Sequence, residues 1–373
     1  MLADQAHLRR PGGHSATGPP PWRVLQLNMQ RSSACLHLLI QFLQSSPHEV
    51  LLLQDPPASL HATSGTLPGF QLFRPTCRGA RASDPTPLAL IAVHHSLVAR
   101  SVPFHHPRLC GVFLSTSRGP VACVSVYIQH TNGQGISALA ALLSKIREST
   151  PLILVGGDCN GHSSWWGPPD QEPNRVGQEM EDLIMSQSLE VLNRQPSPPT
   201  FVSDMGFEAW LDITLTSRQL RPFQMSWEVV ETHLDSDHRP ISSSFSMTTA
   251  IADRGPTQRN WRKVDWDAFR ASLLSRLSTS FAEPPQVTTS AALTDYYAGL
   301  ETALKATISE CVPTKHPCAA SNPWWNEDLE ALRLELQRRR RRWTRTKTRE
   351  DKHRANDCRR QLHQATAAAK MEN

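Results

Sequence analysis

Short apolar stretches separated by polar and turn residues recur along most of the chain, and their spacing distinguishes strands from helices. Compact apolar stretches bounded by Gly, Pro, Asn or Ser predict strands. We predict strands at 23–28, 49–54, 70–74, 88–93, 111–115, 121–127, 151–155, 189–192, 210–215, 226–231 and 240–245. The strand over 151–155 is expected to end in a turn formed by Gly156, Gly157 and Asp158.

Helical spacing of apolar residues predicts further segments. Ser32 or Ser33 is a suitable N-cap for the first of them. Helices are expected at about 33–44, 136–148, 175–186, 265–277, 290–308 and 327–370, the last as one long basic helix. Because strands outnumber helices and are joined both by crossover helices and by hairpins, the pattern suggests an α/β fold with two packed sheets flanked by helices.

The character of the sequence changes after Met247. Residues 1–21 have no apolar run and are expected to be a disordered leader, whereas 22–247 carry the alternating pattern. We interpret 248–322 as a linker with helical segments and 323–373 as a basic helical tail. The length of 373 residues accommodates one large domain with an appendage, and 29 prolines argue against a helical bundle.

The net charge of +5 is distributed unevenly. Residues 333–360 contain 13 Lys or Arg and 4 Asp or Glu, a local charge of +9, so the other 345 residues carry −4. The run from Arg338 to Arg342 suggests salt-dependent contact with nucleic-acid phosphates. A solvated helix face, a coiled-coil flank or a nuclear localisation signal would explain the same run.

The eight cysteines include no Cys-x-x-Cys pair, and several lie in apolar strands, where a reduced cysteine acts as a small hydrophobe. This favours a reducing intracellular setting, with the nucleus as one suitable place, over a disulfide framework. The spacing of Cys311, His316, Cys318, His353 and Cys358 matches no standard zinc finger, so we favour scattered residues. Because no apolar run approaches the length of a membrane span, we expect a soluble protein without membrane contact.

Polar side chains suited to hold a metal or activate water follow several predicted strands. Carboxylates and amides at strand ends can converge on one edge of a sheet, where the scaffold fixes them. Oxygen ligands of this type suit a hard cation such as Mg²⁺, and one His without Cys argues against structural zinc. These residues are Asn28, Asp55, Tyr127, Asp158, Asn160, Asp212, Asp237 and His238.

Each of these residues also has an ordinary structural explanation. A Gly-Gly-Asp segment after a strand is most often a simple turn, and Asp237-His238 before a strand is often a cap or a surface pair. Tyr127 would then be a core aromatic with a solvated hydroxyl. Their recurrence at successive strand ends within one domain favours a shared site over independent coincidences.

The ordered segments LQLN, LLLQDP, SVY, GGDCNGHSSWWG, LDITLTS and SDHRPI resemble the endonuclease domain of LINE-type (non-LTR) retrotransposons. Those domains are similar to apurinic/apyrimidinic endonucleases and belong to the endonuclease/exonuclease/phosphatase superfamily. The resemblance covers about 22–247, and its most specific part is the aromatic pair Trp165-Trp166 after the GDxN segment. The tail, with PWWNEDL, resembles the region that precedes the reverse transcriptase in such polyproteins.

The resemblance implies a four-layer α/β sandwich with a C-terminal helical extension, and Mg²⁺-dependent hydrolysis of a DNA phosphodiester, with Mn²⁺ as an alternative ion. It places Asp55 at the metal-ligand position with Asn28 beside it, and Asp237 in support of the metal or the neighbouring His. Thr200 and Ser236 fall at positions that contact substrate in relatives.

The resemblance also implies the catalytic roles. Asp158 would orient or deprotonate the attacking water, and Asn160 would hold the phosphate. His238, oriented by Asp212, would stabilise charge on the phosphoryl oxygens, and Tyr127 would contact the phosphate. An in-line attack by water needs a positioned base, a Lewis acid and donors aimed at the developing charge, so these roles are chemically consistent.

One position departs from the family. Relatives have Glu in the motif QEP where this chain has Asp55, and Asp is shorter by about 1.5 Å of reach. Since Mg²⁺ demands near-ideal geometry, we expect weakened cleavage. Three hypotheses therefore stand: a DNA-nicking endonuclease, a nucleic-acid-binding remnant that has lost cleavage, and a small-molecule phosphoesterase of the same superfamily. Trp165-Trp166 and the polyprotein-like tail argue against the third.

Overall fold

The computed structural model describes residues 21–61, 66–75, 86–129, 134–249, 261, 264–281, 289–313 and 324–372. The chain divides into two compact units, one made of 1–250 with 324–373 and the other of 251–323. The leader expected at 1–21 lies outside the described residues except for Pro21, and so do many residues of the expected linker.

The first sheet has six strands in the order β13-β14-β1-β2-β4-β3. These are β1 (Trp22–Asn28), β2 (Val50–Gln54), β3 (Phe70–Phe73), β4 (Ala89–His94), β13 (Gln224–Val229) and β14 (Ile241–Phe245). β1 and β2 run parallel, while the other neighbours are antiparallel. The register pairs Asn28 with Gln54, so β1 and β2 end at the same edge.

The second sheet also has six strands, in the order β5-β6-β7-β8-β12-β9. They are β5 (Ala99–Ser101), β6 (Leu109–Thr116), β7 (Gly119–Tyr127), β8 (Ile153–Asp158), β9 (Leu189–Val191) and β12 (Asp212–Ser217). Asp158 is register-paired with Tyr127 on the parallel strand β7 and with Asp212 on the antiparallel strand β12. Three predicted site residues therefore lie side by side at one edge.

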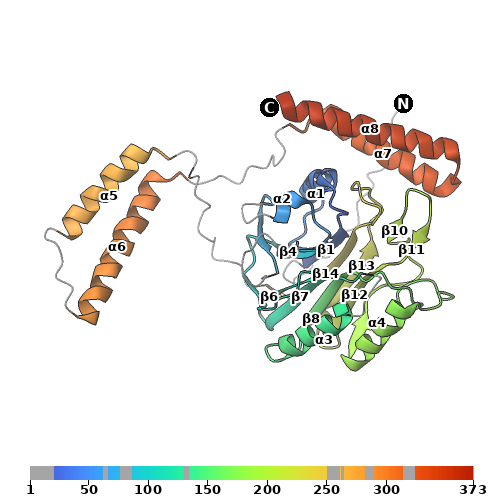
Figure 1. Ribbon diagram of the computed structural model, residues 1–373, viewed down its shortest axis with the longest axis horizontal. Coiled ribbons are helices and arrows are strands. Elements are labelled where there is room, and N and C mark those ends of the chain that lie inside the picture. Colours follow the sequence, from blue (N-terminus) through green and yellow to red (C-terminus); the bar gives the residue numbers. More distant parts are fainter. Residues whose placement is uncertain are drawn as a thin grey trace, which may run out of the picture. The chain divides into compact units, whose positions relative to one another are not determined.

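The two sheets pack face to face, with side chains such as Leu52 and Leu154 forming the core between them. Helices α3 (Gln134–Arg147) and α4 (Arg175–Ser186) cover the outer face of the second sheet. Helix α1 (Ser33–Ser45) covers the first sheet, and Ser32 caps it by accepting a hydrogen bond from the backbone N–H of Cys35. This order of layers is the predicted four-layer α/β sandwich (Figure 1).

The predicted turn after β8 is wrong, because the strand continues through Gly156 and Gly157 to Asp158. A Cβ atom on Gly157 would lie 1.8 Å from the carbonyl oxygen of Val126 in β7. A Cβ on Gly156 would lie 2.5 Å from Gln26 Oε1 of the opposite sheet. The glycines permit these close approaches, and the chain need not reverse there.

The single long helix expected over 327–370 is also wrong. The tail forms two helices, α7 (Glu327–Thr346) and α8 (Arg349–Glu372), which pack against each other as a helical hairpin. Lys347 ends α7 in the left-handed region at φ +54°, and its N–H donates to the carbonyl of Trp343. Thr348 then accepts a hydrogen bond from the N–H of Asp351 and begins the next helix.

Most other predicted elements are confirmed, with ends shifted by a few residues. The second unit contains the two helices that the sequence predicted there, α5 (Trp266–Ser280) and α6 (Ser290–Cys311), and they pack against each other. The sequence pattern did not predict the shortest elements: β5, α2 (Ala58–His61), the turn η1 (Arg221–Phe223) and the hairpin β10 (Phe201–Val202) with β11 (Glu208–Ala209). Their brevity leaves no periodicity to detect.

The cysteines that the structure describes are all free thiols. Cys77, His316 and Cys318 lie outside the described residues. Cys311 and Cys358 each direct the thiol at a backbone carbonyl, of Ala268 and Leu332 respectively. No helix in the described part of the chain is long and apolar enough to span a bilayer.

Candidate active site

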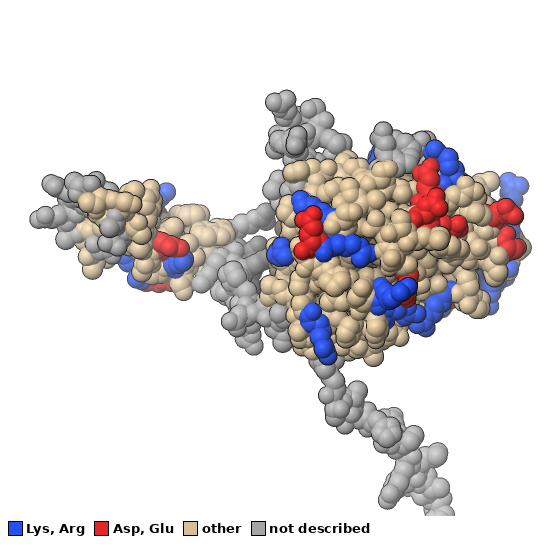
Figure 2. Space-filling model, turned by 90° about the horizontal axis from the view of Figure 1, so that it is seen from below, with Lys and Arg blue, Asp and Glu red and all other residues tan. Residues whose placement is uncertain are grey.

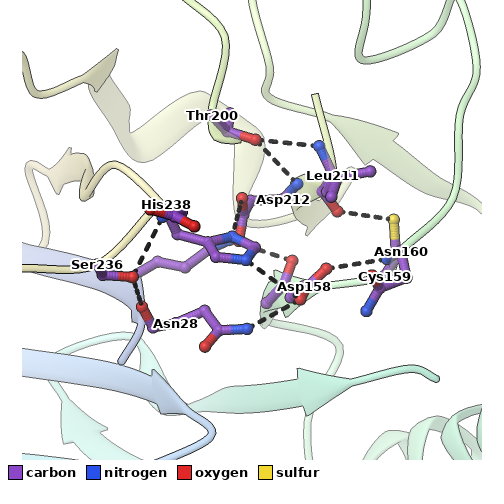
Figure 3. Close-up of polar contacts among 12 residues, drawn as sticks. Asn28, Asp158, Cys159, Asn160, Thr200, Leu211, Asp212, Ser236 and His238 are labelled. Carbon is purple, nitrogen blue, oxygen red and sulfur yellow. Dashed lines mark hydrogen bonds and ion pairs between the residues drawn. The ribbon is translucent and has the colours of Figure 1, made fainter. Parts of the chain in front are cut away.

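Four side chains from strand ends and one loop form a continuous polar chain between the two sheets (Figure 3). Asn28 Nδ2 donates to Asp158 Oδ2 at 2.9 Å, which links the end of β1 to the end of β8. His238 Nδ1 lies 2.9 Å from Asp212 Oδ2, and its Nε2 lies 3.8 Å from Asp158 Oδ2. The imidazole therefore stands between two carboxylates, and all four side chains are buried.

Burial and charge shift the pKa values of this group in a consistent way. Burial raises the pKa of Asp158 to about 7, although nearby His238 opposes the shift. Burial alone would lower the pKa of His238, but the carboxylates of Asp212 and Asp158 outweigh it and raise the pKa to about 9. These shifts favour a positively charged imidazole and make Asp158 a stronger proton acceptor than an ordinary carboxylate.

Asn160 follows β8 in the left-handed region at φ +50°, which Asn adopts more readily than most residues. Its N–H donates to Asp158 Oδ1 at 2.9 Å, and its Nδ2 donates to the carbonyl of Ile128 at 2.8 Å. The fully buried Trp166 donates from Nε1 to the carbonyl of Gly161 at 3.1 Å, while Trp165 is 42% exposed. The aromatic pair thus has one residue that fixes the turn and one that faces solvent.

Two predicted substrate-contact residues are buried and hold other site residues. Thr200 Oγ1 accepts hydrogen bonds from the N–H groups of Leu211 and Asp212, at 3.0 and 3.1 Å. Ser236 Oγ donates to the carbonyl of Asn28 at 2.7 Å and accepts from the N–H of His238 at 3.1 Å. Their hydroxyls are therefore engaged in placing Asp212 and His238.

Asp55 lies at the open side of this chain, directly after β2. Its backbone has φ +42°, and its carboxylate accepts a hydrogen bond from Arg31 Nε at 2.8 Å. Tyr127 is half-buried nearby, and burial together with the charges of Asp158 and Asp55 raises the pKa of its phenol. The predicted metal ligand is thus paired with a side-chain cation from the β1–α1 loop.

The side-chain oxygens at the end of β2 are of the chemical type that binds a hard divalent cation. Asp55 supplies a carboxylate that is 16% exposed, and Gln54, one residue earlier, has a buried Oε1 without a hydrogen-bond partner. An orphaned buried acceptor of this type calls for water or an ion. In the described ranges, however, no cluster of three or more His, Cys, Asp and Glu side chains is arranged around a common point. Such an ion would depend on amide oxygens, water and substrate for its other ligands.

Asp237 is partly exposed, and its backbone contacts the loop between β1 and α1. Its N–H donates to Gln30 Oε1 at 2.8 Å, and the N–H of Gln30 in turn donates to Asn28 Oδ1 at 2.9 Å. Burial raises the pKa of the Asp237 carboxyl, with a further contribution from Asp204.

Backbone strain is concentrated around these residues. Of the non-glycine residues with positive φ in the described part of the chain, five belong to the site or its immediate loops: Gln30, Arg31, Asp55, Asn160 and Asp235. Such conformations persist where the surroundings over-determine them, and they gather at functional sites. Sequence reasoning missed Gln30, Arg31 and Asp235, because nothing in their neighbours indicates which distant groups they contact.

A cavity of about 480 Å³ lies away from this site. It is lined by polar residues of β1, β13, β14 and the end of α1, among them Arg23, His48, Glu49 and Ser242. His48 is already hydrogen-bonded to Ser242 Oγ at 2.9 Å. The cavity includes none of the predicted site residues.

Comparison with known proteins agrees with the sequence motifs. Residues 121–242 match the family model described as endonuclease-reverse transcriptase. The structure is similar to the endonuclease domain of TRAS1, a telomere-specific non-LTR retrotransposon, with a TM-score of 0.52 and 24% identity over 61% of this chain and 99% of that one. It is also similar to the AP endonuclease LMAP from Leishmania major, with a TM-score of 0.50 and 14% identity over 61% and 88%. No curated protein matches the sequence significantly.

These comparisons confirm the resemblance to retrotransposon and apurinic/apyrimidinic endonucleases. They also show that the structure shares its fold with these two endonucleases. The matched segment 121–242 begins in β7 and ends in β14, so it includes Tyr127, Asp158, Asp212 and His238.

Proposed function

We propose that residues 22–247 form a metal-dependent endonuclease domain of retrotransposon lineage that nicks DNA. The observation that supports this most directly is the buried chain from Asn28 through Asp158 to His238 and Asp212, placed at the edge where both sheets end. The same groups, in the same order, characterise the family that the sequence resembles.

In this mechanism Asp158 is the general base and His238 the electrostatic stabiliser. With a pKa of about 7, Asp158 can accept a proton from a water molecule near neutral pH, a match that favours efficient transfer. His238 stays protonated because Asp212 holds its Nδ1 side, so its Nε2 side presents positive charge to the phosphoryl oxygens.

The remaining site residues bind and orient the phosphate. Asn160, fixed by its contacts to Asp158 and Ile128, directs its amide at the phosphate, and Tyr127 donates its phenol from the neighbouring strand. Thr200 and Ser236 act through other residues, because their hydroxyls already place Asp212 and His238.

Asp55 would hold the divalent cation, together with Asn28 and Asp237, the other two positions that the resemblance assigns to the metal. Mg²⁺, or Mn²⁺ in its place, would supply Lewis-acid stabilisation of the phosphate. The ion pair of Asp55 with Arg31 favours a second candidate, a weakened nuclease that still binds nucleic acid, because Arg31 occupies an oxygen that the cation needs.

Plasmid nicking tests the proposal. The full chain with Mg²⁺ should convert supercoiled DNA to the relaxed form, and Asp158→Asn or His238→Gln should each lower kcat by ~10²-fold or more. Asp170→Asn, at an exposed position, is the matched control. If neither the wild type nor Asp55→Glu gives relaxed product, the endonuclease function is rejected. Turnover of soluble phosphoesters in the same preparation would instead indicate a small-molecule phosphoesterase.

The basic tail is the second region that we propose to contact DNA. Many charges in 333–360 are already engaged within the chain, as in the pairs Arg339–Glu335, Arg342–Asp351 and Lys347–Glu208. The face in Figure 2 shows Lys and Arg in small groups, several of them beside Asp and Glu. We propose that the exposed Arg345 and Arg349, next to the hairpin turn of the tail, make the phosphate contacts.

A further inference from the structure

Asp235 is a buried carboxylate in the loop that carries Ser236 and His238. Its side chain is only 2% exposed, and its backbone has φ +57°, in the left-handed region. A buried charge is costly unless other groups compensate it. The conformation of this loop therefore depends on the partners of Asp235.

Three side chains provide that compensation. Arg359 Nε donates to Asp235 Oδ1 at 2.6 Å, and His363 Nε2 lies 3.2 Å from the same oxygen. Ser32, the N-cap of α1, donates its hydroxyl to Oδ2 at 2.9 Å. Burial alone would raise the pKa of Asp235, but His363 and Arg359 outweigh it and hold the pKa well below its usual range. Two of the three partners come from α8.

The polar chain continues from Asp235 into the catalytic groups. The next residue, Ser236, bonds to the carbonyl of Asn28 and to the N–H of His238. The carbonyl of Asp237 accepts a hydrogen bond from Val202 of β10 at 2.8 Å. Arg359 is therefore linked, through Asp235 and Ser236, to the backbone on which His238 is held.

The α7–α8 hairpin packs against the rest of the large unit through several side chains, so Arg359 is one of many contacts between them. Leu336 of α7 and Leu362 of α8 are buried in one apolar cluster with Leu39 of α1. Around this cluster, Gln337 and Arg341 donate to the carbonyl of Glu231 at 3.1 and 2.7 Å. This apolar packing gives α8 a defined position against the loop.

Further ion pairs join the hairpin of helices to the β10–β11 hairpin. Arg340, whose side chain is 12% exposed, lies 3.3 Å from Asp204, and Lys347 lies 2.6 Å from Glu208. The tail thus contacts the β10–β11 hairpin, whose Phe201 ring packs against His238, and the loop after β13, which carries His238.

We propose that Arg359 is a positioning residue for the endonuclease site, and that the α7–α8 hairpin is an integral part of that site. This inference rests on the function proposed for residues 22–247. In this proposal the basic α7–α8 hairpin does more than bind phosphate. It also holds the loop that carries His238 in position.

The test compares Arg359→Ala with Arg360→Ala in the full chain. Arg360 is the adjacent residue of the same helix, its side chain is 70% exposed, and it pairs with Asp357 within α8. We expect Arg359→Ala to lower kcat for plasmid nicking by ~10- to 100-fold with little change in KM, as for lost supporting contacts at other sites. Amide hydrogen exchange over 234–238 should accelerate, while β8 and β12 stay protected. Arg360→Ala should behave like the wild type in both measurements.

The two readouts separate this inference from the proposed function. If the wild type does not nick DNA, the endonuclease proposal fails, whereas the exchange comparison still tests the role of Arg359. Equal exchange and equal kcat in the two variants would overturn the inference. If Arg359→Ala does not fold, Arg359→Lys replaces it, because Lys keeps the charge but loses the planar fork. Wild-type kcat and exchange in Arg359→Lys and in Asp235→Asn would likewise overturn it.

Discussion

At the scale of single residues, the Arg31–Asp55 ion pair engages the carboxylate that we propose as a metal ligand. Arg31 Nε donates to one oxygen of this carboxylate at 2.8 Å. The positive φ of Asp55 is a conformation that Asp adopts more readily than Glu. Asp at this position, where the resembling family has Glu, therefore suits both the backbone conformation of residue 55 and the ion pair with Arg31.

Arg31→Ala should tighten the binding of Mg²⁺ or Mn²⁺ to the full chain. A largely exposed ion pair contributes at most ~1 kcal/mol, so the expected gain is about two- to fivefold in Kd. Isothermal titration with the metal alone measures it, and Arg218→Ala, which breaks the distant pair with Glu190, is the control. Unchanged affinity in Arg31→Ala would show that the pair does not compete with the metal.

Gly157 is the residue where a single methyl group should do most harm. Gly157→Ala would place Cβ against the carbonyl of Val126, so we expect a loss of at least ~3 kcal/mol in the free energy of unfolding or no folded protein. Gly119→Ala is the comparison: Gly119 has φ +96° but open space around it, so the loss should be only ~1 kcal/mol. Urea unfolding followed by fluorescence distinguishes the two, and similar losses would contradict the steric argument.

At the scale of secondary-structure elements, the sequence was informative where a pattern is local. The strands that carry Asn28, Tyr127 and Asp158 are long enough to show apolar periodicity, and the order of their polar ends matches a known family. The break in the tail was also readable, because Thr348 and Asp351 have the spacing of a helix-capping motif. The length of the basic run concealed that signal.

Contacts between distant elements could not be predicted in this way. Asp235 and Arg359 are 124 positions apart, and neither has a neighbour that indicates the other. A buried carboxylate looks in sequence like any surface acid, because burial is a property of the packed fold. The convergence of Asn28, Asp158, Asp212 and His238 was thus predictable from the sequence, whereas the groups that hold them were not.

The docking of α8 against α1 should weaken in mild acid. His37 of α1 packs edge-on against Trp324, and burial, with Lys370 nearby, lowers the pKa of His37 to about 4. The docked state therefore cannot take up a proton that the undocked state binds at its usual pKa of ~6.5. This contribution to docking is fully present above pH 6.5 and is lost as the pH falls towards 4.

Limited proteolysis of the tail at pH 7 and pH 5 measures this effect. His37→Gln stays neutral throughout, so the wild type should show a larger increase in cleavage between the two pH values than this variant. Asp235 remains charged over this range, because its pKa is held well below its usual value. The same pH dependence of cleavage in the two proteins would show that protonation of His37 does not weaken the docking of α8.

At the scale of the whole molecule, the charge of the tail is divided between folding and binding. Three basic residues of the tail pair with acidic residues outside it, so their charge is partly neutralised within the chain. These pairs are Arg340–Asp204, Lys347–Glu208 and Arg359–Asp235. The net charge of a segment therefore overstates the charge that it can offer to DNA.

Salt dependence of DNA binding tests this division. Arg345→Ala with Arg349→Ala should reduce the slope of log K against log salt by about 2, one for each phosphate contact. Arg354→Ala with Arg360→Ala removes the same charge from residues paired within α8, and should change the slope less. Fluorescence anisotropy with a labelled duplex gives both slopes, and equal reductions would contradict the proposed contacts.

The link between Asp235 and Arg359 also sets the order in which the protein becomes complete during synthesis. Every strand of both sheets is made before α8, so the sheets can pack while the support of the catalytic loop is still untranslated. At ~5–20 residues per second, a ribosome takes roughly 6–25 s to cover the 124 positions between the two residues. During that interval, a nascent chain would have all the strands of both sheets while the loop that carries His238 still lacked its partner in α8.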